Sequence, residues 1–177
     1  RTFDEVGDRK GHQKLGLAVA GVLINGKHYF FEEDRAAELF KLLSQQELIV
    51  GHNLFDFDYK VLEKYFPTVS FHLKTFDTFA FLRNLTKDWI RLDDIGIHSF
   101  GMKKPCDSKE IPKMWRSGKR DEVLAYLLND LKMTEKLYLS GIKGAALKYM
   151  KRDYGEPIGV TQVFVKFPEF KNKDGAP

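Results

Sequence analysis

The sequence predicts an α/β protein with an antiparallel hairpin and flanking helices. Three observations point to this class. Two β-rich segments near the start are joined by Asn25-Gly26, a short apolar segment ending at Gly51 leads into a helix, and several later segments carry apolar residues at helical spacing. Strands that alternate with helices after an initial hairpin are typical of a mixed sheet covered by helices.

The hairpin is the most regular local pattern. Leu15–Ile24 is apolar and rich in β-formers, and Lys27–Phe31 continues as a second strand. Asn25-Gly26 between them is the signature of a type I′ turn, whose twist matches that of paired strands.

The next three elements follow from spacing and end signals. Apolar residues at helical spacing predict a helix over Asp34–Gln46, with Asp34 as its N-cap. Glu47–Gly51 is a short buried strand, and a second helix runs from about Asp58 to Phe66, where Pro67 ends it.

The remaining segments continue the alternation, and residues 140–152 continue the last helix or form a linker. We expect strands at Val69–Leu73 and Val160–Phe167, and helices at Asp77–Asn84, Leu92–Phe100, Glu110–Trp115 and Arg120–Leu139. We assign residues 1–150 to one domain and residues 151–177 to a C-terminal extension with one strand and a polar tail.

Composition excludes several classes of protein. The chain has 177 residues, 43% of them hydrophobic and 31% charged, which is ordinary for a soluble globular domain. Cys106 is the only cysteine, so there is no disulfide scaffold and no zinc site of the cysteine type. The apolar runs are shorter than the roughly 20 residues of a membrane helix, and we expect a cytoplasmic protein.

The charge is unevenly divided along the chain. Residues 1–90 carry 12 basic and 13 acidic side chains, whereas residues 91–177 carry 17 basic and 12 acidic ones. The excess lies mostly in Lys103–Arg120 and Lys143–Arg152. Such clusters fit a phosphate-backbone partner, and a solvated helix face explains the charge equally well.

Polar residues follow the buried strand that ends at Gly51. Asn53 comes two residues after it, and Asp58 lies where the next helix begins. Side chains at strand ends of α/β sheets are rigidly held outside the packed core, which is why active sites form there. The alternative is that Asp58 only caps the helix.

A second polar pair lies in the longest helix. Tyr126 and Asp130 are four residues apart and therefore share one face. Apolar neighbours, among them Val123 and Leu127, indicate that this face points inward. A buried carboxylate needs a cation or hydrogen-bond donors, so either a metal ion or a nearby Arg or Lys would satisfy Asp130.

Taken together, these motifs resemble the DEDD family of 3′–5′ exonucleases, which have an RNase H-like fold. Asn53 with Phe57-Asp58 matches that family's second motif, and Tyr126 with Asp130 matches the third motif of its tyrosine subclass. The histidine subclass would have His where this chain has Ala125. The likeness covers roughly residues 3–140 and is greatest to bacterial RNase H-like domains found alone or beside DEAD/DEAH-box helicases.

The resemblance implies a function. The chain would hydrolyse phosphodiester bonds of DNA or RNA with two Mg²⁺ or Mn²⁺ ions, for which Asp58 and Asp130 would be ligands. Tyr126 would orient or help deprotonate the attacking water, and Asn53, Lys103 and Lys104 would bind substrate. The partners implied are a single strand or 3′ end of a nucleic acid and a helicase domain or protein.

One part of the family pattern is missing. The first motif, Asp-x-Glu on the first strand, would supply the other metal ligands, and it is expected just ahead of Arg1. Asp4 and Glu5 do not replace it, because adjacent residues on a strand point to opposite faces. The first strand is thus missing or upstream. The alternative function is a catalytically impaired RNase H-like module that binds nucleic acid, or an accessory domain of a helicase.

Overall fold

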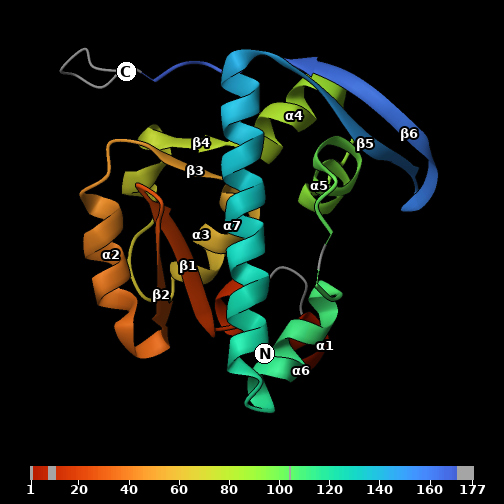
Figure 1. Ribbon diagram of the computed structural model, residues 1–177. Helices are drawn as coiled ribbons and strands as arrows, with labels where there is room; N and C mark the ends of the chain where they lie inside the picture. Colours follow the sequence, from red (N-terminus) through yellow and green to blue (C-terminus); the bar gives the residue numbers. More distant parts are fainter. Residues whose placement is uncertain (1, 8–10, 104, 171–177) are drawn as a thin grey trace. The chain divides into compact units, whose positions relative to one another are not determined.

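The computed structural model describes residues 2–7, 11–103 and 105–170. The chain divides into two compact units, which are considered separately. Unit 1 comprises Arg1–Ile49, Asn53–Thr75 and Pro105–Leu131, and unit 2 comprises Val50–His52, Phe76–Lys104 and Lys132–Pro177. In the described residues the strands form three two-stranded sheets, accompanied by seven α-helices (Figure 1). The α/β class is therefore confirmed.

Unit 1 begins with the hairpin that the sequence predicts. β1 (Val19–Ile24) pairs antiparallel with β2 (Lys27–Glu32), with Ile24 opposite Lys27. Asn25 and Gly26 have φ values of 50° and 75°. A type I′ turn needs positive φ at both central residues, so the Asn-Gly prediction is confirmed.

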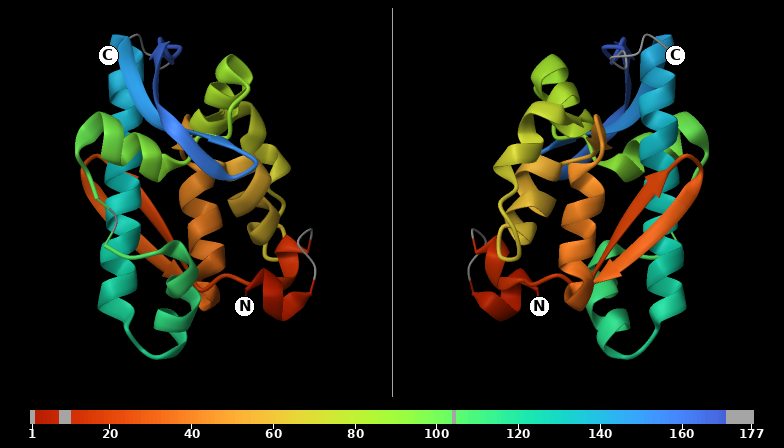
Figure 2. Two further views of the ribbon diagram at one scale, coloured as in Figure 1. Left: turned by 90° about the vertical axis from the view of Figure 1, so that its right-hand side faces the viewer. Right: turned by 90° about the vertical axis from the view of Figure 1, so that its left-hand side faces the viewer.

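The core of unit 1 lies against this hairpin. α2 (Ala36–Ser44) runs beside it, as Figure 2 shows, and α3 (Tyr59–Leu62) contributes further apolar side chains. The cluster consists of buried apolar residues from five segments: Phe31, Ala36, Leu39, Leu43, Ile49, Tyr59, Leu62, Phe66 and Phe71. The predicted N-cap, Asp34, is wrong. Asp34 lies in the 3₁₀ turn Glu33–Arg35, and Arg35 precedes α2 without a side-chain cap.

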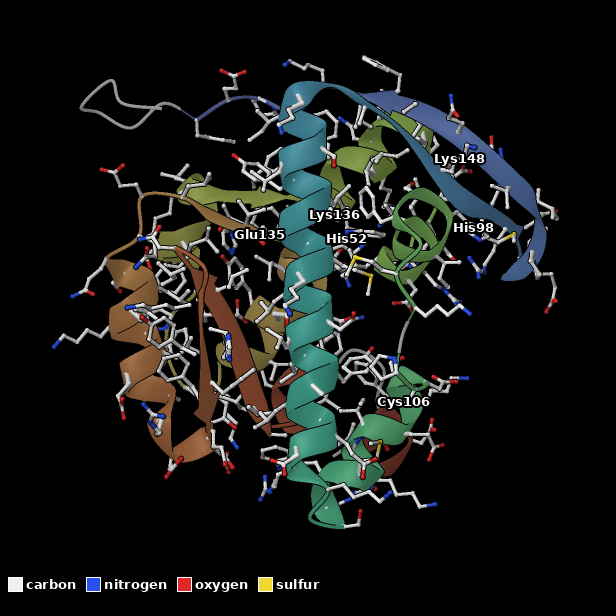
Figure 3. All side chains as sticks on the ribbon, in the orientation of Figure 1. His52, His98, Cys106, Glu135, Lys136 and Lys148 are labelled. Atoms are coloured by element: carbon white, nitrogen blue, oxygen red, sulfur yellow. The ribbon has the colours of Figure 1, made fainter. Side chains whose placement is uncertain are left out.

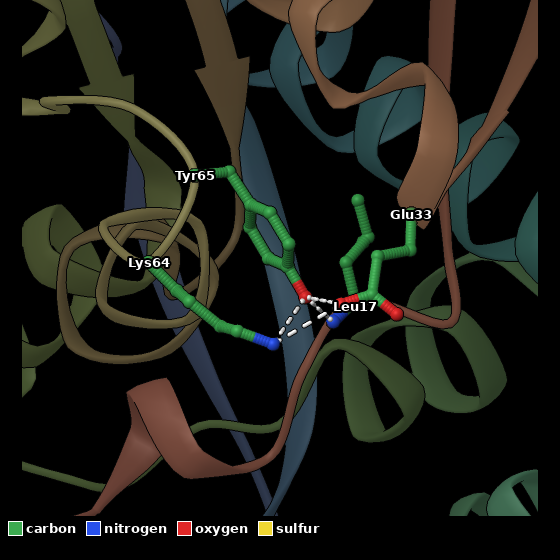
Figure 4. Close-up of polar contacts among 4 residues, drawn as sticks. All are labelled: Leu17, Glu33, Lys64 and Tyr65. Carbon is green, nitrogen blue, oxygen red and sulfur yellow. Dashed lines mark hydrogen bonds and ion pairs between the residues drawn. The ribbon is translucent and has the colours of Figure 1, made fainter.

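The phenol of Tyr65 fastens the segment that leads into β1. Its oxygen accepts the backbone N–H of Leu17 at 2.8 Å and donates to Glu33 Oε1 at 2.5 Å (Figure 4). Lys64 Nζ lies 3.1 Å from the same Glu33 oxygen. The hydrogen bonds from Tyr65 and Lys64 lower the pKa of the Glu33 carboxyl group. Three segments of unit 1 are thereby joined at one point.

Unit 1 contains two further short helices. α1 (Phe3–Val6) begins with a capping box between Thr2 and Glu5. α6 (Ile111–Arg116) occupies the position predicted for a helix at Glu110–Trp115, and Arg116 pairs with Glu5.

The predicted strand at Val69–Leu73 is wrong. This segment is a 3₁₀ helix, Val69–Lys74. Phe71 is buried, whereas Val69 and Leu73 are 70% and 102% exposed. Thr68, three residues before Phe71, is also buried, so the buried positions follow the period of a 3₁₀ helix rather than that of a strand.

One short strand and two helices lie where the sequence predicts them, and the second short strand was not predicted. β3 (Ile49–Gly51) pairs with β4 (Thr75–Asp77). Asp77 Oδ1 accepts the N–H groups of Phe79 and Ala80 and so caps α4 (Thr78–Thr86). α5 (Leu92–Phe100) ends at Gly101, whose φ of 65° confirms the predicted C-terminal glycine.

The C-terminal part differs from the sequence prediction. α7 (Arg120–Lys143) is longer than expected, and residues 145–153 form a strand, β5 (Ala145–Asp153), instead of a helix or linker. β5 pairs antiparallel with β6 (Glu156–Val165), which overlaps the predicted last strand. The expected domain boundary at residue 150 thus falls within β5.

One face of this second hairpin packs against the rest of unit 2. Leu147, Tyr149 and Val165 are buried, and Ser99 of α5 exchanges hydrogen bonds with the backbone of Lys148. The opposite face of β6 is exposed: Ile158 is 61%, Val160 52% and Phe164 69% accessible.

The ring of Phe167 is central to the packing of unit 2. Its centroid lies 5.0 Å from those of Phe76 and Phe81. It also fills the space beside Gly141 of α7, where a Cβ atom would come within 2.1 Å of the ring. Only glycine at this position lets the ring lie against the helix.

An RNase H-like sheet, with all strands joined, is not seen in the described residues, whose strands form separate pairs. Within those residues, no helix combines the length and apolar character needed to cross a bilayer.

Two glycines of unit 2 provide a matched test of this packing. Gly141→Ala should lower the free energy of unfolding by about 1–3 kcal/mol, because the rigid Phe167 ring cannot move aside. Gly96→Ala also places a Cβ 2.1 Å from a neighbour, but that neighbour is the flexible sulfur of Met133. Its cost should be offset by the roughly 1 kcal/mol gain in helix propensity. Urea unfolding compares them; equal losses would contradict this account.

Candidate active site

The end of β3 has an unusual backbone. Asn53 has a φ of 71°, in the left-handed region, and the next residues form a π-helical turn, Leu54–Asp58. The N–H of Tyr59 closes this turn on the carbonyl of Leu54. Asn tolerates positive φ better than most residues, and π turns are frequent at functional sites. The side-chain oxygen Oδ1 of Asn53 is shielded from solvent.

Asp58 follows directly from this turn. Its side chain is exposed, and although it precedes α3, it makes no capping hydrogen bond to that helix. The alternative that Asp58 serves only as a helix cap is therefore not supported. Asp77 shows the contrast, because its carboxylate caps α4 with two hydrogen bonds.

His52, just before Asn53, has a structural role. Its Nε2 lies 3.1 Å from the carbonyl of Ile90, and its Nδ1 lies 3.0 Å from the hydroxyl of Thr78. The carbonyl can only accept, so Nε2 carries the proton of the neutral ring. Nδ1 faces the hydroxyl oxygen of Thr78, whose own proton is donated to the carbonyl of Gly51 at 2.9 Å. Burial lowers the pKa of His52 to about 4. The ring is therefore neutral at pH 7, as a structural histidine rather than a general base.

Tyr126 and Asp130 are brought together as their spacing predicts. Both lie on α7, Tyr126 is 5% exposed, and Oδ1 of Asp130 is shielded from solvent. Burial and the Asp130 carboxylate raise the pKa of the Tyr126 phenol, which is hydrogen-bonded to that carboxylate. The phenol consequently keeps its proton, and its O–H donates a hydrogen bond to the Asp130 carboxylate. This state fits the orienting role expected for Tyr126 better than that of a base.

Two neighbours of Tyr126 were not predicted as part of this site. Cys106 and Asp107 are close enough for their negative forms to contribute to the raised pKa of the phenol. Cys106 is partly buried, and its sulfur lies 3.9 Å from that of Met114. They come from the irregular segment before α6, and no local sequence pattern indicates that this segment approaches α7.

The inward face of α7 was only partly predicted. Val123 is buried as expected, whereas Leu127, Leu131, Thr134 and Tyr138 are intermediate. The fully buried positions are instead Val123, Tyr126, Met133, Leu137 and Gly141. Tyr126 thus belongs to the buried side of the helix itself.

The predicted site residues are divided between the two units. Asn53, Asp58, Tyr126 and Asp130 belong to unit 1. Lys103 is exposed and belongs to unit 2. Lys104, also predicted to bind substrate, lies outside the described residues, as does Arg1.

The residues expected to hold metal do not by themselves fit a pair of ions. In the ranges that the structure describes, no group of three or more His, Cys, Asp or Glu side chains is arranged to hold a metal. Mg²⁺ and Mn²⁺ prefer several oxygen ligands, and two carboxylates are too few for two ions. Asp58 and Asp130 could contribute to such a site only with further ligands.

An aromatic residue on a short helix, such as Trp115 of α6, can either contact a single strand or anchor the helix. The Arg120 guanidinium lies over its ring, 3.5 Å from the centroid, and both residues belong to unit 1. This stacking covers one face of the indole and favours the anchoring role.

The buried imidazole of His52 predicts a pH dependence of stability. The pKa is lower in the folded chain than the ordinary value of 6.5, so below that value the unfolded chain binds the proton first. Stability should therefore fall from pH 6.5 to about 4, by up to about 3 kcal/mol. Thermal unfolding across this range should show a smaller loss for His52→Gln than for the exposed control His28→Gln. Parallel curves for both variants would contradict the assignment.

The Tyr126–Asp130 hydrogen bond predicts coupling between the two residues. Tyr126→Phe should lower the free energy of unfolding by about 1–3 kcal/mol, because a shielded carboxylate loses a donor. In combination with Asp130→Asn the two effects should be non-additive by at least about 0.5 kcal/mol. Tyr138→Phe is the control, since no hydrogen bond of its phenol is seen in the described residues. Additive losses measured by urea unfolding would exclude the coupling.

Comparison with known proteins identifies no relative. No protein-family model, no curated protein and no solved structure matches this chain.

Proposed function

We propose that the chain is the RNase H-like nuclease domain of a metal-dependent 3′–5′ exonuclease that hydrolyses phosphodiester bonds of DNA or RNA. The single observation that supports this most is the pair on α7. A carboxylate on the buried side of a helix accepts a hydrogen bond from the phenol one turn before it, and the two residues have the spacing of the Tyr-x-x-x-Asp motif. Asn53 and Asp58, at the end of β3, supply the second motif in the same unit.

Each of these residues has a distinct task in the proposal. The O–H of Tyr126 donates a hydrogen bond to the Asp130 carboxylate, and so fixes the direction in which the carboxylate presents its other lone pairs. Asp58 is exposed, so its side chain is accessible to a cationic partner. Asn53 holds the left-handed turn that places Asp58 after the strand. Further carboxylates are required, and the proposal expects them in an Asp-x-Glu pair ahead of Arg1.

A second function is favoured by a separate observation. The described residues contain no three-ligand metal group, while unit 2 carries an excess of positive charge. A module that binds nucleic acid without cleaving it needs only the second of these features. This is the alternative against which the nuclease must be tested.

The test compares this chain with one extended upstream. Labelled single strands of DNA and RNA are incubated with Mn²⁺, and 3′-end shortening is followed on gels. The extended chain should release mononucleotides, and Asp130→Asn and Asp58→Asn should each reduce the rate by at least about a hundredfold.

Asp56→Asn is the matched control, because Asp56 is an exposed carboxylate of the same turn that pairs with Lys60 at 3.1 Å. Its rate should remain within about twofold of the parent, as for a surface pair of little energetic weight. If the extended chain is inert, or if Asp130→Asn leaves its activity unchanged, the nuclease proposal fails. Binding of the strands without cleavage would then support the non-catalytic module.

A further inference from the structure

A pocket in unit 2 is lined by basic residues that the sequence motifs do not include. It is open, has a volume of about 400 Å³, and lies along the C-terminal half of α7. Lys132, Lys136 and Lys143 line it, with Glu135 as its one acidic residue. Figure 3 shows Glu135 and Lys136 on the middle of this helix. The pocket is therefore positively charged.

The three lysines differ from those surface lysines that are held in ion pairs. Lys60, Lys64 and Lys119 each pair with a carboxylate. Among the described residues, no carboxylate lies within ion-pair distance of Lys132, Lys136 or Lys143. Lys136 lies instead over the ring of Phe100, 5.1 Å from its centroid. Their charges are thus available to an anion from outside the chain.

The arrangement of the lysines indicates the shape of that anion. Lys132 and Lys143 are eleven residues apart on one helix, which corresponds to about 16 Å along its axis. A row of this length exceeds one phosphate group and matches several consecutive phosphates of a strand. Lys143 also complements the C-terminal end of the helix dipole, but Lys132 and Lys136 lie too far from that end for this explanation.

The rest of the lining suits a nucleotide chain as well. Met102 and Leu139 present apolar surface, Leu139 being 51% exposed, and Ser140 lies between the lysines. Sugars and bases need such contacts in addition to charge, and unstacked bases of a single strand can make them. Lys103, which was predicted to bind substrate, follows Met102 in the chain.

The charge of the whole unit has the same sign. Unit 2 contains 14 basic and 9 acidic side chains, whereas unit 1 contains 15 basic and 16 acidic ones. The net charges are +5 and −1. The basic excess therefore belongs to the unit that carries the pocket, and it would draw a polyanion toward that unit.

We propose that this pocket binds the phosphate backbone of a single-stranded nucleic acid, through Lys132, Lys136 and Lys143. The choice of nucleic acid over other polyanions rests on the proposed function. The binding itself needs neither hydrolysis nor a metal ion.

The test measures binding where cleavage cannot occur. Labelled twelve-nucleotide strands, dT and rU, are titrated with this chain in EDTA at several salt concentrations, and fluorescence anisotropy gives the affinity. Replacing all three pocket lysines by Gln should weaken binding by about tenfold or more. It should also reduce the slope of log K against log salt by about 2, because each phosphate contact of a single strand contributes roughly 0.7.

Two further variants keep the test independent of net charge and of folding. Lys27, Lys41 and Lys109 are exposed lysines of unit 1, and their joint replacement by Gln removes the same charge. This control should bind nearly as the parent does. Glu135→Gln removes the pocket's acidic residue and should strengthen binding, an effect that misfolding cannot produce.

The outcomes separate this inference from the nuclease proposal. Equal weakening by the two triple variants, or no gain for Glu135→Gln, would overturn it. So would displacement of the strand by free mononucleotide or by polyglutamate at equal charge concentration. Strand binding that depends on the pocket lysines, together with an upstream-extended chain that is inert with Mn²⁺, would retain the inference and reject the nuclease. Hydrolysis with equal binding by both triple variants would do the reverse.

Discussion

The periodicity of α7 constrains much of this protein. An α-helix of 24 residues turns every 3.6 residues, so a helix that is packed along its length must be apolar on one side throughout. On the buried side lie Val123 and Tyr126 in unit 1, and Met133 and Leu137 in unit 2. Asp130 falls between these positions and is stabilised by the phenol of Tyr126. Lys132, Lys136 and Lys143 lie on the exposed side.

Packing against Gly141 illustrates how strictly the buried side is specified. The Phe167 ring occupies the space that the side chain of any residue other than glycine would need at position 141. The helix and the segment after β6 also share a backbone hydrogen bond, from Phe167 N–H to the carbonyl of Gly141 at 2.9 Å. Helix propensity alone would favour Ala at this position by about 1 kcal/mol, so the glycine reflects the close approach of the ring.

Local signals predicted the elements whose ends are defined by specific residues. The Asn-Gly turn and the Gly101 helix end were predicted because each needs a particular backbone conformation. The prediction failed where the same residues were compatible with the period of a strand and with that of a 3₁₀ helix. Val69, Phe71 and Leu73 alternate as in a strand, yet only Phe71 is buried. β5 was missed because Ala, Leu, Lys and Met favour helices, and its pairing with β6 overrides that preference.

The candidate site was likewise predicted in part: residues on one regular helix were predicted, and those on an irregular segment were not. The four-residue spacing of Tyr126 and Asp130 was sufficient to place them together, since both lie on one regular helix. Cys106 and Asp107 approach that pair from an irregular segment, which no spacing rule describes. The row of Lys132, Lys136 and Lys143 was not predicted, because charge was counted over two halves of the chain, whereas unit 2 combines residues from both halves.

The edge of β6 that does not pair with β5 has a consequence for pairing with strands from outside the chain. In the described residues, β5 is the only strand that pairs with β6, so one edge of this ten-residue strand pairs with no other strand. Pro157 and the shift in register near Lys151 interrupt its first part. From Val160 to Val165 there is neither proline nor charge. That short segment is a template for extension of the sheet by an added strand.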